Sequence, residues 1–144
     1  MFDLDVDQRI STWVNHRNFL DNTDNSLQEC WNFWKVAPFV PYNAKIDPYF
    51  QRGWPTPWEI IRDNKYDDFT KSLMISWTLK LTEKFKNSDI YIKFFIDNAQ
   101  SRQYNLVFID DNWILNYNDE CPIHVSNLDQ ALIMQNLIEI TRPR

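Results

Sequence analysis

Glycine is almost absent from this chain, and its scarcity limits both the turns and the sites that the protein can form. Among 144 residues, only Gly53 is a glycine. Glycine takes positive φ angles without steric cost, so the turns here must rely on asparagine, aspartate and proline. Phosphate-binding loops of the GxGxxG or GxxxxGK[ST] type need at least two glycines, and a serine-hydrolase elbow needs one on either side of its serine. The sequence therefore excludes these sites.

The length, charge and hydropathy of the chain favour a single domain, residues 1–144. Its two cysteines, Cys30 and Cys121, are compatible with a reducing compartment such as the cytosol. A chain of 144 residues falls within the usual size of one domain, roughly 100–200 residues. The formal net charge of −5 argues against a nucleic-acid partner, because non-specific binding depends on Lys and Arg replacing phosphate counterions. No apolar run approaches the roughly 20 residues that span a bilayer, so we expect no membrane partner.

Apolar residues recur at helical spacing in four stretches of the chain. They predict helices over residues 6–20, 26–36, 57–63 and 67–86. Ser26 with Glu29, and Thr56 with Glu59, have the spacing of a capping box, which closes the first turn of a helix. The helix over 67–86 is apolar on more than one side, which is typical of a helix with neighbours on several flanks. We expect it to be central.

After this helix the apolar period changes to that of β-strands. The runs IYIKFFI, QYNLVFID and WILNY predict three strands, with Asp111-Asn112 as a tight turn between the last two. The segment 126–140 is broadly apolar, and we expect a helix there, with a strand as the alternative. The predicted fold class is α+β, with helices packed on a three-stranded antiparallel β-meander.

The residues that catalyse reactions or bind metals in other proteins form no recognisable set here. Cys30 lies on the apolar side of a predicted helix, where an inert core residue belongs. Cys121 and His124 have the spacing of a metal knuckle, but a closed zinc site needs four ligands. The remaining candidates, Cys30 and His16, lie on separate predicted helices. We therefore expect no catalytic residue, no metal and no cofactor.

Aromatic residues are the one functional signal in the composition. They make up 16% of the chain and include seven tryptophans, more than we expect the core of one domain to absorb. Large aromatic side chains dominate protein–protein interfaces. The stretch RGWPTPWEII leaves two readings open for its indoles, inward packing or an exposed anchor. The candidate interface residues are Trp54, Trp58, Tyr49, Phe50, Phe33 and Trp34.

Several blocks of the sequence resemble a family of short uncharacterised proteins from marine contractile-tailed bacteriophages. The blocks are WVNHRNFL, APFV, WPTPWEII and DDFTKSLMISWTLKLT, and the likeness covers roughly residues 10 to 118. The family has no assigned activity, so the resemblance implies a viral origin and a place in the virion or the host cytoplasm. Given that origin, the excess of aromatic residues favours a minor structural or assembly component of the head or tail, with other virion proteins or further copies of the chain as partners. The alternative is an effector that binds and inhibits a host protein.

The helix and meander, ending in YNLVFIDDNWILNYND, are also similar to the core of transglutaminase-like and papain-like cysteine hydrolases. That resemblance implies a cysteine near Tyr66, a histidine near Tyr104 or Asn105, and an aspartate near Asn118 or Asp119. Only Asp119 matches. Without the thiol and the imidazole, nucleophilic attack has no carrier, so the resemblance implies a core that has lost the reaction. An enzyme of this fold with an unusual site is the remaining alternative.

Overall fold

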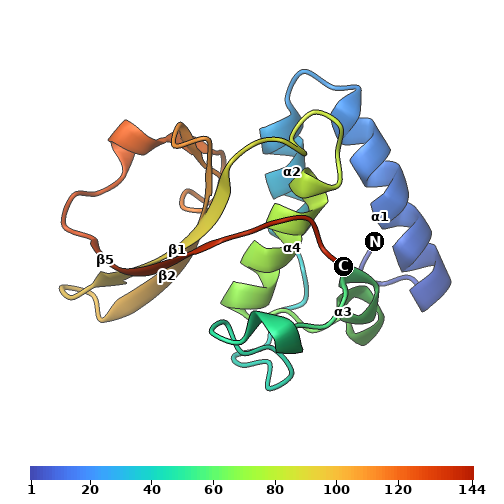
Figure 1. Ribbon diagram of the computed structural model, residues 1–144, viewed down its shortest axis with the longest axis horizontal. Coiled ribbons are helices and arrows are strands. Elements are labelled where there is room, and N and C mark those ends of the chain that lie inside the picture. Colours follow the sequence, from blue (N-terminus) through green and yellow to red (C-terminus); the bar gives the residue numbers. More distant parts are fainter.

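Polar caps and apolar spacing in the sequence produce four α-helices, which lie on one side of a five-stranded antiparallel sheet (Figure 1). The computed structural model describes residues 1–144. The helices are α1 Val6–Asp21, α2 Ser26–Trp34, α3 Pro57–Asp63 and α4 Asp68–Lys80. The strands are β1 Ile90–Asp97, β2 Arg102–Ile109, β3 Trp113–Ile114, β4 Ile123–His124 and β5 Ile133–Glu139. No helix combines the length and the apolar character that crossing a membrane requires.

One of the two predicted capping boxes forms. At the start of α3, the Thr56 hydroxyl accepts the Glu59 N–H at 3.3 Å, and a Glu59 carboxylate oxygen accepts the Thr56 N–H at 3.1 Å. The box predicted at Ser26 is wrong, because α2 begins directly after Asn25 with no side-chain cap. The Ser26 hydroxyl donates instead to the carbonyl of Leu20 at 2.7 Å, which ties α2 to the end of α1.

The turns that need positive φ angles use residues other than glycine, as the scarcity of glycine predicts. Positive φ angles occur at Asn64, Ser101, Asp110 and Asp111, and at no glycine. Gly53 has a different reason to be glycine: a Cβ atom there would lie 2.7 Å from the ring of Phe50. The one glycine therefore provides room for an aromatic ring rather than backbone freedom.

Helix α4 is central, as the sequence predicts, but it is shorter than predicted. Ten of its thirteen residues are buried, and its contacts run to α2, β1 and β2. It ends at Lys80 rather than at residue 86. The carboxylate of Asp21 accepts the N–H groups of Glu83 and Lys84 at 3.2 and 2.9 Å. Because these two N–H groups donate to a side chain of α1, they are not available for the backbone hydrogen bonds that would continue α4.

The α+β class is confirmed, whereas the three-stranded sheet is wrong. The strand order is β4-β3-β2-β1-β5, so the predicted meander forms the middle of a five-stranded sheet. The segment predicted as a C-terminal helix contains β5, which pairs antiparallel with β1. Ile138 and Ile140, two positions apart, both join the main core. That spacing of two is the period of a strand.

The sheet has an apolar layer on each face. The larger layer lies between the sheet and the helices and contains 24 buried residues. The smaller layer, on the other face, is built on Phe95, Leu106, Phe108, Ile114 and Leu132. Partly buried residues of the segment 117–128 pack against it, and this segment is visible beyond the sheet in Figure 1. The segment thus covers the face that the helices leave open.

Candidate functional site

Most of the tryptophans belong to the interior. Trp13, Trp31, Trp34, Trp54 and Trp77 are each at most 6% exposed, so five of the seven lie in the core. The expectation that the tryptophans exceed what the core absorbs is therefore wrong for these five. Trp34 and Trp54, both candidate interface residues, present almost no surface to a partner. Trp58 and Trp113 are about two-fifths exposed.

Hydrogen bonds explain why the indoles can be buried. The Nε1 groups of Trp13 and Trp34 both donate to the hydroxyl oxygen of Thr78, at 2.9 and 3.1 Å. Trp54 donates to the carbonyl of Asp47 at 2.7 Å. A buried N–H group without a partner is costly, so these acceptors permit the burial. The sequence does not reveal them, because each acceptor lies on another part of the chain or on the backbone.

The corner WPTPW divides its two indoles between the core and the surface. The Trp54 ring lies 5.6 Å from Phe69 and 6.1 Å from Trp77, measured between ring centroids. Trp58 instead stands edge-on to Trp13 at 5.0 Å and is 40% exposed. Of the two interpretations, inward packing is therefore correct for Trp54, whereas the Trp58 side chain is only partly covered by its own chain.

Exposed aromatic rings are concentrated on one irregular segment. Residues 39–50, called here the aromatic segment, connect the end of α2 to α3. Its four aromatic side chains are between 57% and 74% exposed, and they are Phe39, Tyr42, Tyr49 and Phe50. Sequence reasoning had selected the last two as interface candidates and missed the first two. Phe39, Tyr42 and Tyr49 each directly follow a proline, and all four rings lie in a stretch with no helical or strand period, which is the signal that the sequence offers.

The backbone under these rings is anchored. The N–H of Val40 donates to the carbonyl of Tyr66 at 3.0 Å, and the N–H of Asn43 donates to the carboxylate of Asp67 at 3.0 Å. Ile46 is buried in the main core. Tyr49 also lies against the sheet, with its ring centroid 5.9 Å from that of Phe94. The segment therefore offers exposed rings on a backbone that is already held in place.

The remaining candidate, Phe33, is half-buried and packs within the chain. Its ring stacks on His16 with centroids 3.9 Å apart and an interplanar angle of 12°. Burial lowers the pKa of His16 to about 4. The imidazole is thus neutral at pH 7 and behaves as part of the aromatic core.

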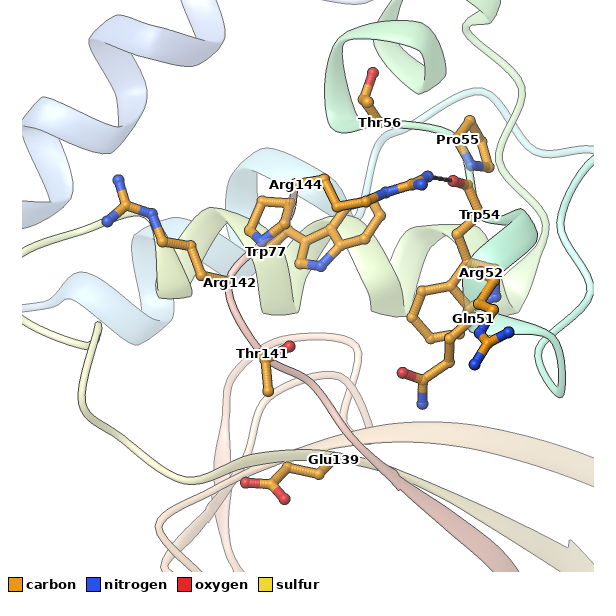
Figure 2. A pocket seen from close by; sticks show the side chains of 11 residues that line it. Gln51, Arg52, Trp54, Pro55, Thr56, Trp77, Glu139, Thr141, Arg142 and Arg144 are labelled. Atoms are coloured by element: carbon orange, nitrogen blue, oxygen red, sulfur yellow. Dashed lines mark hydrogen bonds between the residues drawn. The ribbon is translucent and has the colours of Figure 1, made fainter.

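A pocket of about 440 Å³ lies between the corner and the C-terminal residues (Figure 2). Arg52, Arg142 and Arg144 line it, and Glu139 is its one acidic residue. Arg144 donates to the carbonyl of Trp54 at 2.5 Å, while Figure 2 shows Arg142 pointing the opposite way. None of the three arginines forms an ion pair. The pocket can receive a carboxylate or phosphate group, but its arginines do not converge on one point.

A smaller polar hollow of about 170 Å³ lies at the start of α4. It brings together Tyr104, Asn105 and Asp119, the positions named by the resemblance to cysteine hydrolases, with Asp68 and Lys71. Burial lowers the pKa of Lys71, although the negative charges of Asp68 and Asp119 act to raise it. Tyr66, the position named for the cysteine, is fully buried and does not line the hollow.

No cysteine or histidine lines this hollow. Cys30 is buried in the core, and burial raises the pKa of its thiol. Cys121 is exposed. No group of three or more histidine, cysteine, aspartate or glutamate side chains is placed to hold a metal ion. The hollow therefore offers hydrogen-bonding groups and a lysine, without a thiol nucleophile.

Neither a scan against protein-family models nor a search of curated proteins finds a match to this chain.

Proposed function

We propose that this protein is a non-enzymatic protein–protein interaction module, a minor structural or assembly component of a tailed-phage virion. The observation that carries the proposal is the aromatic segment 39–50, with its four rings more than half exposed on an anchored backbone. The phage origin comes from the sequence resemblance and the interaction role from the surface.

Exposed aromatic rings on a fixed backbone are suited to binding. Each large aromatic side chain buries about 150–250 Å² when it is covered. Aromatic side chains have only two χ angles, and the backbone here is held by Tyr66 and Asp67, so little conformational freedom remains to be lost on binding. A large apolar surface left in water is uncommon in a monomer and marks interaction sites.

The position of the thiols favours an interaction module over a cysteine hydrolase. The hollow at the start of α4 contains no thiol, and the thiol of Cys30 in α2 is buried with a raised pKa. A thiol-reactive probe at neutral pH is expected to label Cys121 alone. Rapid labelling of Cys30 would favour the hydrolase alternative.

Purified phage particles provide the test of the virion role. We expect mass spectrometry to detect the protein in particles and expect the double variant Tyr49→Ala/Phe50→Ala to be lost from them. The matched control is Phe19→Ala, which removes an exposed ring from α1, away from the aromatic segment. Absence of the wild-type protein from particles, with recovery of a host protein from infected cells, would favour the inhibitor alternative.

A further inference from the structure

The outer edge of β5 is an unpaired strand edge. β5 is the last strand of the sheet and pairs only with β1. The N–H of Ile140 donates to the carbonyl of Ile90 at 2.8 Å, so Ile140 faces β1. Because backbone direction alternates along a strand, the N–H and C=O groups of Leu137 and Glu139 point away from β1. The Leu137 N–H is bonded only to the side-chain oxygen of its neighbour Asn136, at 2.8 Å.

This edge has few of the features that protect strand edges from pairing. Its apolar side chains, Ile133, Met134 and Leu137, are between 41% and 48% exposed. Natural edges are protected by charged side chains, proline, β-bulges, short length or a covering segment. β5 has seven residues, no lysine and no proline, and its protective features are one glutamate, Glu139, and one bulge at Gln135. The opposite edge of the sheet, β4, has only two residues and therefore offers little to a partner.

We propose that the outer edge of β5 pairs antiparallel with β5 of a second copy of this chain, across a two-fold axis at Leu137. The proposal goes beyond the function argued above and does not use the aromatic segment, so either can fail alone. The pairing would continue the sheet from one copy into the other and satisfy the outward backbone groups of both strands.

The charge of the strand selects this axis. Glu139 is the only charged residue of β5. With the axis at Leu137, the two Glu139 side chains lie four positions, or about 13 Å, apart along the strands. An axis at Glu139 would put the two carboxylates directly opposite, which destabilises a strand pair. Leu137 is thus the outward-facing residue that can meet its own copy without repulsion.

The bulge in β5 also limits where the two-fold axis can lie. The register between β1 and β5 shifts between Phe94 and Phe95, which leaves Gln135 as the extra residue of β5. The regular part of the free edge therefore runs from Asn136 to Glu139, and Leu137 lies within it. The opposed side chains of the two Leu137 residues would then cover apolar surface that is exposed in the single copy.

The first test compares oligomeric state in two variants by analytical ultracentrifugation. The wild-type protein is expected to dimerise as its concentration rises. Leu137→Pro removes an N–H that makes no bond to β1, so the variant should keep its fold and remain monomeric. Leu137→Val keeps the N–H and should still dimerise. A wild-type protein that stays monomeric, including one that binds a strand from another protein, would overturn the proposal, as would a folded Leu137→Pro variant that still dimerises.

The second test fixes the register and does not depend on the proline variant folding. In a Cys121→Ser background, Leu137→Cys is expected to form an intermolecular disulfide under mild oxidation. Opposed residues of a hydrogen-bonded antiparallel pair have Cα atoms about 5.5 Å apart, within disulfide range. Glu139→Cys is the matched control, since its thiols would lie about 13 Å apart. Equal cross-linking at both positions, or at neither, would contradict an axis at Leu137.

Discussion

The aromatic residues of this protein fall into two regions with opposite relations to solvent. In the interior, Trp13 and Trp34 share one hydroxyl acceptor, and their rings pack against other aromatic side chains. On the aromatic segment, Tyr42 and Tyr49 are more than two-thirds exposed although their backbone is held. The difference teaches that a count of tryptophans is a poor sign of an interface. Trp13, Trp34 and Trp54 are buried because the fold supplies an acceptor for each indole N–H and rings that pack against it.

The largest expected change in stability comes from removing an aromatic ring from the interior. Trp34→Ala should destabilise the protein by about 3–5 kcal/mol, because it empties a fully buried site. Tyr49→Ala on the aromatic segment should change the free energy of unfolding by at most about 0.5 kcal/mol. Chemical denaturation of both variants measures the contrast. Comparable losses in the two variants would mean that the aromatic segment is part of the core.

A smaller effect is expected from removing only the shared acceptor. Thr78→Val keeps the side-chain volume but leaves the indole N–H groups of Trp13 and Trp34 without their partner. Each unsatisfied buried donor costs about 1–3 kcal/mol, so we expect a loss of about 2–4 kcal/mol in urea denaturation. Thr12→Val is the matched control, because the Thr12 hydroxyl bonds only within its own helix. A loss no greater than that of the control would show that the indoles do not need this hydroxyl.

The pH dependence of stability tests whether His16 belongs to the interior. Its pKa is lowered from 6.5 to about 4 by burial. The unfolded chain therefore takes up a proton below pH 6.5 that the folded protein takes up only near pH 4, so stability should fall as the pH falls through this window. Because the ring is only partly buried, we expect a loss on the order of 1–2 kcal/mol.

A histidine variant checks this prediction. Unfolding free energies measured from pH 7 to 4 should vary less in His16→Gln than in the wild type. A His16→Gln profile identical to that of the wild type would place the acid-sensitive group elsewhere.

The smallest effect is expected at the corner where the two regions meet. Thr56→Ala removes the capping box between Trp54 and Trp58 and should cost about 1 kcal/mol of stability. Thr23→Ala, at a half-buried threonine whose side chain makes no hydrogen bond, is the control. Thermal unfolding followed by tryptophan fluorescence reports both variants. An unchanged midpoint in Thr56→Ala would mean that packing alone sets the corner.

The features that the sequence predicts well are local. The Thr56 capping box and the strand period of 90–96 depend on residues within a few positions, and both are found. For the C-terminal segment the expected helix is wrong and the alternative, a strand, is found, because its strand identity comes from pairing with β1, which is distant in the sequence. The early end of α4 has a similar cause, since Asp21 supplies the competing hydrogen bonds.

The candidate site was predictable only in part, for the same reason. Composition predicts that aromatic rings form an interface, but it does not show which rings are exposed. Trp54 is buried because Phe69 and Trp77, which are distant in the sequence, pack against it. Phe39 and Tyr42 are exposed because no part of the fold covers them. Neither outcome follows from the neighbouring residues in the sequence.

Radical footprinting of purified phage particles, the assembly in which we propose that the protein resides, tests the central claim most directly. The account predicts that Tyr42, Tyr49 and Phe50 react readily in the isolated protein and become protected in the particle. Trp34 and Trp54 should stay unreactive in both, because they are buried within the chain itself. Equal reactivity of the three exposed rings in the isolated and the assembled protein would contradict the claim that these rings hold a partner.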